Sequence, residues 1–182
     1  VIGRLNYKLD EKLINQLSKH LKAPILADSL SQMRFDNELT LKLYDHYINS
    51  DDINPDLIIR IGQKPVSRNL CKKLDQWKDK TINRLSFSSL LIDEFGRFND
   101  DSPTVIESNY KEFIKFIIKY TKKNLNLNFY NHITELDKKV VTILKDEKEW
   151  SELMIAKASL SSINNDENFF IGNSMPIRYI DM

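Results

Sequence analysis

Two alternating patterns of apolar residues constrain this chain more than any other feature. Short apolar runs alternate with longer segments in which apolar residues recur every three or four positions. The first pattern is typical of buried strands and the second of helices that pack on one face. Strands that alternate with helices predict a parallel sheet, because each parallel crossover needs a connection long enough to hold a helix. The predicted fold class is therefore α/β, a doubly wound and mostly parallel sheet with helices on both faces.

The patterns place the predicted elements along the chain without an internal repeat. The predicted strands cover 1–3, 24–27, 56–62, 86–92, 104–107 and 169–172. The predicted helices follow the cap Asp10, cover 39–49, open at Ser67, and then cover 109–120, 132–145 and 150–163. The Asn-rich tract 122–131 is predicted to be a connection, because such residues are typical of turns. Asp146 is predicted to mark the break between the last two of these helices.

Length and charge limit the size of the protein and its partners. The chain has 182 residues, of which 41% are hydrophobic, enough for one compact domain of about 150 residues with an additional segment. We place the boundary near residue 150, with a first unit at 1–150 and a second at 151–182. Lys and Arg number 27 against 26 Asp and Glu, so the net charge of +1 gives no overall attraction to nucleic acid or to an anionic membrane.

The single cysteine and the short apolar runs indicate a compartment. Cys71 has no partner for an internal disulfide or a multi-cysteine zinc site, which predicts a cytoplasmic protein. No apolar run approaches the roughly 18 to 20 residues of a membrane-spanning helix, and the first residues lack a signal-peptide core. Residues 1–3 have the composition of the inside of a buried strand, so we expect the sequence to be a fragment of a longer chain.

Two segments that follow predicted strands could hold a ligand. Ligands of open parallel sheets gather at the carboxyl ends of the strands, where helix N-termini present free N–H groups. The first segment is 62–68, in which Ser67 caps a predicted helix and Arg68 stands in its first turn. This arrangement suits a carboxylate. The simpler interpretation, a cap followed by a solvated surface charge, stays open.

The second segment is 172–178, again a strand end followed by a predicted helix start. Pro176 suits the first turn of a helix. Ser174 and Arg178 are four residues apart, which places a hydroxyl and a guanidinium on one helical face, where they could grip a substrate carboxylate. An ordinary cap with a surface arginine is the alternative interpretation.

Other familiar sites are not indicated by the sequence. Gly62 stands without a G-x-G-x-x-G pattern, so no dinucleotide site is predicted. The histidines (His20, His46 and His132) are scattered beside charged residues without H-E-x-x-H spacing, which favours surface side chains over metal ligands. The serines of 86–92 lack a G-x-S-x-G turn, so no hydrolase nucleophile is predicted.

Several of these segments, in this order and spacing, resemble one enzyme family. They are 24–31, 55–62 followed by 65–68, 93–97, and 172–178, of which the last reads Gly-Asn-Ser-Met-Pro-Ile-Arg. The chain resembles, over nearly its whole length, the 2-succinyl-5-enolpyruvyl-6-hydroxy-3-cyclohexene-1-carboxylate synthases, thiamine-diphosphate enzymes of menaquinone biosynthesis. The resemblance implies a parent of three domains, with this chain as its Rossmann-like central domain plus the first strand and turn of the pyrophosphate-binding domain.

The resemblance also implies an activity, cofactors and partners for the full-length parent. Such an enzyme decarboxylates 2-oxoglutarate on thiamine diphosphate, held with Mg²⁺ or Mn²⁺, and transfers the succinyl unit to isochorismate. The family implies a homo-oligomer, a dimer or tetramer, whose active site forms between subunits. The glutamate that activates the thiamine ring and the Gly-Asp-Gly diphosphate motif lie outside residues 1–182. We therefore expect no cofactor-binding or metal-binding residue in this chain, and no turnover by the chain alone.

Three residues match functional positions of the family. Ser174 and Arg178 correspond to an active-site serine and arginine, and are predicted to be catalytic and substrate-binding. Arg68 stands where the family has a basic residue, often lysine, and is predicted to bind substrate. Tyr179 replaces the family's aspartate, with Asp181 two residues further on.

Two other functions remain as alternatives. The chain could be the central domain of another thiamine-diphosphate enzyme, of the acetohydroxyacid synthase or pyruvate oxidase type, although its few glycines argue against the flavin or nucleotide that such domains often bind. A noncatalytic regulatory module is the second alternative, in which Arg68 and Arg97 at strand ends hold an anionic metabolite.

Overall fold

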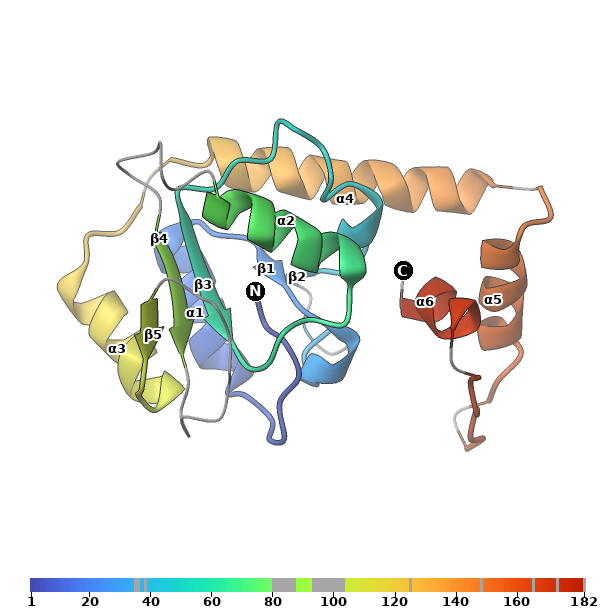
Figure 1. Ribbon diagram of the computed structural model, residues 1–182, viewed down its shortest axis with the longest axis horizontal. Helices are drawn as coiled ribbons and strands as arrows, with labels where there is room; N and C mark the ends of the chain where they lie inside the picture. Colours follow the sequence, from blue (N-terminus) through green and yellow to red (C-terminus); the bar gives the residue numbers. More distant parts are fainter. Residues whose placement is uncertain are drawn as a thin grey trace.

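Helices and short parallel strands alternate through most of the molecule (Figure 1). The computed structural model describes residues 1–34, 37, 39–79, 88–92, 104–124, 126–147, 149–164, 166–172 and 174–181. In chain order the elements are α1 (Glu11–Leu21), β1 (Ile25–Leu26), η1 (Ser29–Ser31), β2 (Thr40–Leu41), η2 (Tyr44–His46), β3 (Leu57–Ile61), α2 (Arg68–Asp79), β4 (Ser88–Ile92), β5 (Thr104–Ile106), α3 (Tyr110–Tyr120), α4 (Asn128–Asp146), α5 (Glu152–Ser161) and α6 (Met175–Asp181). An α/β fold with a parallel sheet is confirmed.

The N-terminal residues join two groups of parallel strands. β1 pairs with β2, and β3 pairs with β4, which pairs with β5, all in parallel. Ile2 bridges Ala27 beside β1 and Ile61 in β3, again in parallel. Its N–H donates to the carbonyl of Leu26 at 2.8 Å, and the N–H of Gly3 donates to the carbonyl of Ile61 at 2.9 Å. The predicted strand at 1–3 is therefore the link that brings β1 and β3 into one sheet.

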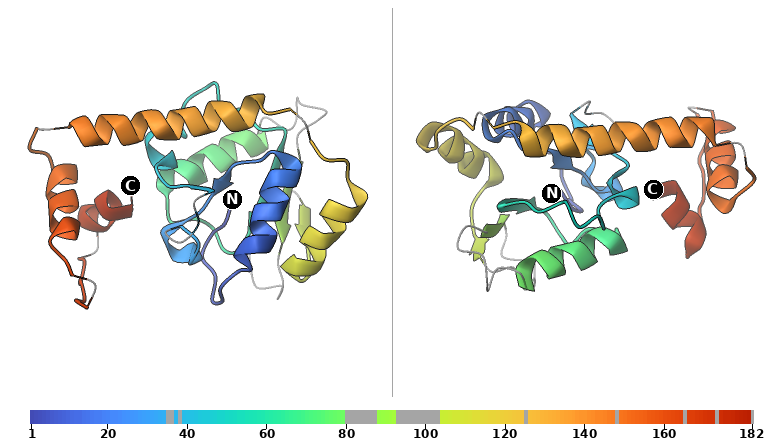
Figure 2. Two further views of the ribbon diagram at one scale, coloured as in Figure 1. Left: turned by 180° about the vertical axis from the view of Figure 1, so that it is seen from behind. Right: turned by 90° about the horizontal axis from the view of Figure 1, so that it is seen from above.

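Successive strand residues contribute to two hydrophobic clusters. Ile25 and Ile61 belong to a cluster with α1 and α3, whereas Leu26 and Ile58 belong to a cluster with α2 and the first part of α4. This alternation follows from the period of two along a strand. Figure 2 shows α1 and α3 on one side of the strands and α2 on the other. The strands are thus apolar on both faces, as parallel sheets covered by helices require.

Polar side chains set the ends of the first helix and of the long fourth helix. Asp10 caps α1, accepting the N–H of Leu13 at 3.1 Å. Asn124 binds the other end of α1, donating from its side chain to the carbonyl of Leu21 at 3.0 Å. Asn126 in turn accepts the N–H of Asn128 at 2.9 Å, where α4 begins. The Asn-rich tract is therefore a connection only as far as Leu127, and its last residues belong to α4.

The predicted helix at 39–49 is wrong. The spacing of Leu41, Tyr44 and Ile48 is that of a helix face, and all three side chains are buried. However, Thr40 and Leu41 pair with β1 as strand β2, and only the 3-10 turn η2 keeps helical geometry. Pairing with a buried neighbouring strand overrides the local preference, because burial of this segment is decided by its tertiary partner.

The C-terminal helices form a separate packing unit (Figure 1). α5 packs against α6, and Lys157 of α5 donates to the carbonyl of Leu144 near the end of α4 at 2.9 Å. The segment 169–172, predicted to be the first strand of a further domain, pairs with none of the described strands, so this strand stays a prediction. Phe170 is 94% exposed. A strand needs a neighbour for its backbone hydrogen bonds, and the described residues provide none here.

Other expectations have simple outcomes. The strands 56–62 and 104–107 are confirmed as β3 and β5, the helix from Asn109 as α3, and the break after Asp146 as the end of α4. Of the predicted strand 86–92, residues 88–92 form β4. The turn 93–97, including Arg97, lies outside the described residues. None of the described helices is both long and apolar enough to cross a membrane.

Candidate functional site

Three loops meet at the carboxyl edge of the sheet, around the first candidate segment. The loop after β1 carries Asp28, which is 1% exposed. Its carboxylate accepts the N–H of Leu30 at 2.9 Å and the N–H of Val66, in the loop after β3, at 2.6 Å. The N–H of Gln63 donates to the carbonyl of Arg4 at 3.0 Å, which ties in the loop after the N-terminal strand. A partly buried hydrogen bond to the Asp28 carboxylate and the backbone bond to Arg4 therefore hold the segment 62–68 in place.

Two glycines allow these loops to approach one another. A Cβ atom on Gly3 would lie 1.8 Å from the carbonyl oxygen of Gln63. Gly62 has φ +89, and a Cβ there would lie 2.8 Å from the carbonyl oxygen of Arg4. Only glycine adopts this conformation and this spacing without strain. Gly62 is thus a structural requirement of this loop.

Ser67 opens α2 as predicted and is buried in doing so. Its hydroxyl accepts the N–H of Leu70 at 3.0 Å and donates to the carboxylate of Asp45. Asn69 also donates to Asp45, at 3.3 Å. The Ser67 hydroxyl therefore makes one hydrogen bond that caps α2 and one that binds the segment containing η2. This geometry supports the structural interpretation of Ser67.

Arg68 is the first residue of α2, and its side chain is exposed. Arg4 and Lys64, in loops at the same edge, are exposed as well. This edge thus presents basic side chains to solvent beside a fixed loop. A guanidinium there can bind a carboxylate through two parallel hydrogen bonds.

The thiol of Cys71, one turn into α2, donates to the carbonyl of Pro65 at 3.1 Å. Burial raises the pKa of this thiol, which makes it a poor nucleophile at neutral pH.

Several buried or partly buried polar residues around these loops were not predicted from the sequence. Asp28, Asp45, Arg34 and Lys73 were not singled out, although Asp28 directly follows a predicted buried strand, which is a usable signal. Arg34 is 4% exposed and donates to the carbonyl of Lys42 at 2.6 Å. Lys73 is 1% exposed and donates to the carbonyl of Ser50 at 2.7 Å. These side chains brace the loops around the site.

The second candidate segment lies at the start of α6. Ser174 directly precedes this helix, is exposed and has φ +89, a backbone conformation that strains any residue with a side chain. Arg178 lies within α6, and its side chain is outside what the structure describes. Tyr179 donates its hydroxyl hydrogen bond to Glu152 of α5, and this bond raises the pKa of the Tyr179 phenol. Tyr179 therefore fastens α6 to α5.

The two candidate segments belong to different parts of the molecule. Arg68 begins α2 on the α/β body, while Ser174 and Arg178 belong to the α5 and α6 unit (Figure 1). In the views of Figures 1 and 2, the N-terminal end of α2 is the end closer to α6. Among the described residues, no group of three or more His, Cys, Asp or Glu side chains could hold a metal ion.

Comparison with known proteins found several proteins of similar sequence. No family model matches it. It is 33% identical over 187 residues to the 2-succinyl-5-enolpyruvyl-6-hydroxy-3-cyclohexene-1-carboxylate synthase of Staphylococcus aureus (strain MSSA476), covering 100% of this chain and 32% of that protein. It is 29% identical over 194 residues to the synthase of the same name from Bacillus pumilus (strain SAFR-032), again covering 100% of this chain and 32% of the relative.

The chain is homologous to these synthases over its whole length. A third synthase, from Desulfitobacterium hafniense (strain DSM 10664 / DCB-2), is 26% identical over 174 residues, covering 91% of this chain and 30% of that protein. The chain thus spans about a third of the length of the synthases it matches. The aligned stretch includes all the segments that carry the resemblance, which are 24–31, 55–62, 65–68, 93–97 and 172–178.

Proposed function

We propose that this chain is the central part of a 2-succinyl-5-enolpyruvyl-6-hydroxy-3-cyclohexene-1-carboxylate synthase. Residues 1–150 form its doubly wound, Rossmann-like central domain, and residues 151–182 lead into the pyrophosphate-binding domain. Two observations support this proposal. The similarity to the synthases covers the whole chain but only about a third of each relative. In addition, α5 and α6 pack on each other and present apolar side chains to solvent, which suits the start of a further domain.

The activity belongs to the full-length enzyme. It decarboxylates 2-oxoglutarate and transfers the succinyl unit to isochorismate, as a cytoplasmic homo-oligomer. Thiamine diphosphate supplies the group that stabilises the acyl carbanion equivalent, and residues outside this chain hold it with Mg²⁺ or Mn²⁺. The role of this chain is to bind and orient the substrates, so the chain alone has no turnover.

The substrates carry several carboxylates, and the proposed contacts fit that chemistry. Arg68 stands exposed at the start of α2, on a loop fixed by Asp28. Arg178 and Ser174 belong to the Asn-Ser-Met-Pro-Ile-Arg run, the most specific motif of the chain, and this run carries the proposal. A guanidinium binds a carboxylate with a planar, bidentate geometry, and the serine hydroxyl adds one more hydrogen bond. We assign all three to substrate binding, and Ser174 and Arg178 also to the reacting centre.

The decisive experiment is steady-state turnover of the full-length enzyme with 2-oxoglutarate, isochorismate, thiamine diphosphate and Mg²⁺. The wild type is compared with the Arg178→Ala variant and with Lys139→Ala, an exposed charge removal on α4, as the matched control. We expect activity in the wild type and in the control, and its collapse in Arg178→Ala. A folded wild type that binds thiamine diphosphate but has no such activity would indicate another thiamine enzyme. Equal activities of all three proteins would contradict the assignment of Arg178 to the substrate site.

A further inference from the structure

Arg68 lies between two residues that bind the same carboxylate. One oxygen of the Asp45 carboxylate accepts the hydroxyl of Ser67, and the other accepts the side-chain amide of Asn69 at 3.3 Å. Ser67 and Asn69 flank Arg68 at the start of α2, so a single residue of η2 holds the chain on both sides of it. The direction in which the Arg68 side chain leaves the helix therefore depends on Asp45.

The short helix η2 is held in turn by α4. The carboxylate of Asp137 accepts the N–H of Leu43 at 3.1 Å and the hydroxyl of Tyr47 at 3.0 Å, so it binds the residue before η2 and the residue after it. Burial, with a further contribution from the Asp137 carboxylate, raises the pKa of the Tyr47 phenol, which therefore stays protonated and donates at neutral pH. The segment that contains Asp45 is thus fixed at both ends.

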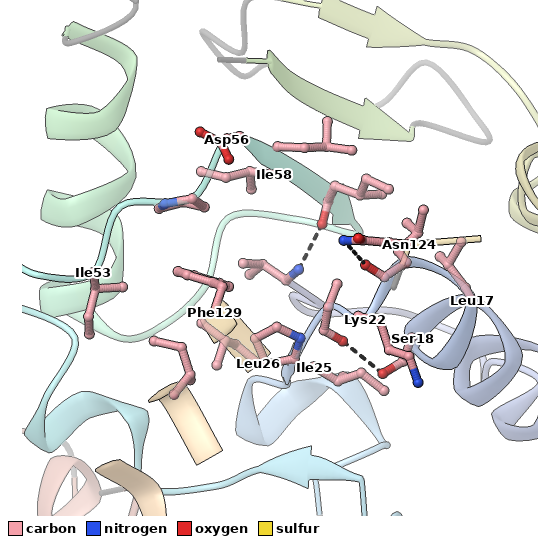
Figure 3. Close-up of a pocket in the computed structure, with 18 of the residues that line it drawn as sticks. Leu17, Ser18, Lys22, Ile25, Leu26, Ile53, Asp56, Ile58, Asn124 and Phe129 are labelled. Carbon is pink, nitrogen blue, oxygen red and sulfur yellow. Dashed lines mark hydrogen bonds between the residues drawn. The ribbon is translucent and has the colours of Figure 1, made fainter. Parts of the chain in front are cut away.

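The first turns of α4 are packed against the sheet. Ile133 of α4 is 2% exposed and belongs to the same hydrophobic cluster as Leu26 of β1 and Ile58 of β3. Figure 3 shows Phe129 of α4 beside a cavity that Leu26 and Ile58 also line. Asp137 follows Ile133 by four residues, which places both on one face of the helix. This packing therefore fixes the position of Asp137 relative to the sheet.

We infer that Asp45 is a positioning residue for Arg68: its carboxylate holds the first turn of α2 in the orientation that presents the guanidinium to a substrate carboxylate. This inference rests on the proposed function, which assigns Arg68 to substrate binding. Asp45 acts through Ser67 and Asn69 and makes no substrate contact of its own. A bidentate contact depends on the direction of the guanidinium plane, so a shift of about 1 Å at the start of α2 is enough to weaken it.

The first test is a double-mutant cycle in the full-length enzyme, with kcat/KM and the melting temperature measured for each protein. Asp45→Ala should lower kcat/KM of the wild type by about threefold to tenfold, because Arg68 is no longer held in its productive orientation. In the Arg68→Ala background the same substitution should lower kcat/KM by less than about twofold, since the group that Asp45 positions is already absent. A decrease of the same size in both backgrounds, or no decrease in the wild type, would overturn the inference.

Asn109→Ala is the matched control for a loss of stability. Asn109 caps α3 by accepting the N–H of Lys111 at 2.9 Å, and α3 lies on the opposite side of the strands from α2 (Figure 2). Each variant loses a side chain that holds the first turn of a helix, so we expect similar decreases in melting temperature. Only Asp45→Ala should lower kcat/KM. If Asn109→Ala lowers kcat/KM as much, the effect of Asp45 is one of general stability and the inference fails.

The second test follows the start of α2 in the absence of substrate. Amide hydrogen exchange of the full-length enzyme is measured in a peptide that covers 66–72. The N–H of Leu70 donates to the Ser67 hydroxyl, and Asp45→Ala removes the acceptor that holds this hydroxyl. We expect exchange at least about tenfold faster than in the wild type, and no change in Asn109→Ala. Unchanged exchange in Asp45→Ala would overturn the inference, whereas a wild type without synthase activity would contradict the proposed function and not this result.

Discussion

The carboxylate of Asp28 accepts the backbone N–H of Val66, 38 residues further along the chain, at 2.6 Å. The same carboxylate accepts the N–H of Leu30 in its own loop at 2.9 Å. A single buried side chain thus joins the loop after β1 to the loop that carries Ser67 and Arg68. The position of the first candidate segment depends on a residue that contacts no substrate in our proposal.

Asp28→Ala should destabilise the protein by about 1–3 kcal/mol, because it removes a buried carboxylate that accepts two partly buried backbone N–H groups. The free energy of unfolding measured in urea checks this value. Asp51→Ala is the matched control, since Asp51 is an exposed turn residue and its loss should change stability by less than about 0.5 kcal/mol. If the two variants have the same stability, the Asp28 carboxylate does not hold these loops.

Gly3→Ala and Gly62→Ala should each destabilise the protein by about 3 kcal/mol or more. The added methyl group on Gly3 would lie 1.8 Å from the Gln63 carbonyl oxygen, so the backbone itself would have to move. At Gly62 the positive φ adds strain to the contact with Arg4. Gly172→Ala is the control, because a Cβ there meets no atom within 4 Å. Similar denaturation midpoints for all three variants would contradict this account.

The features that could be predicted from the sequence are those that local chemistry decides. Asp10 and Ser67 were recognised as caps because their side chains satisfy free N–H groups of the helix that follows. β3 was recognised because a continuous apolar run between turn residues suits a buried strand. Arg68 was correctly placed in the first turn of a helix after a strand.

The features that were missed depend on distant partners. Thr40 and Leu41 form a strand because β1 lies beside them and supplies their hydrogen-bond partners. Lys73 was not singled out in the sequence, but its ammonium reaches the carbonyls of a loop more than twenty residues upstream. Charged side chains can be buried when such partners exist, but the periodicity of a sequence does not indicate which distant groups a side chain will contact.

Lys73→Met should cost about 1–3 kcal/mol of stability, although the methylene stem of the side chain is largely preserved. The buried Lys73 ammonium donates to the carbonyl of Ser50 at 2.7 Å, and its loss leaves that partly buried carbonyl without this donor. Lys72→Met is the matched control, as Lys72 is the exposed neighbour on the same helix. Thermal unfolding of both variants checks the difference, and a Lys73→Met protein as stable as the control would rule out this role.

The stability of the chain with a free Val1 amine should rise with pH between about 5 and 8. Burial lowers the pKa of this amine to about 5 in the folded state, against 8.0 when it is unfolded. In this range the unfolded state binds more protons, so a rise in pH favours the folded state by up to about 4 kcal/mol. Denaturation in urea at pH 5, 6.5 and 8 checks the slope. Acetylation of the amine should abolish this contribution, and an unchanged slope would assign it to other groups.

Arg68→Ala in the full-length enzyme should lower kcat/KM by roughly tenfold to a hundredfold, as expected for the loss of a charge-assisted hydrogen bond of about 1.5–3 kcal/mol. Because the Arg68 side chain is exposed in this chain, the melting temperature should stay within about 2 °C of the wild type. Arg68→Lys should recover part of the activity, since lysine keeps the charge but not the bidentate fork. Lys72→Ala, an exposed charge removal on the same helix, should leave kcat/KM unchanged. If Arg68→Ala turns over substrate as fast as this control, Arg68 is a solvated surface charge and not a substrate contact.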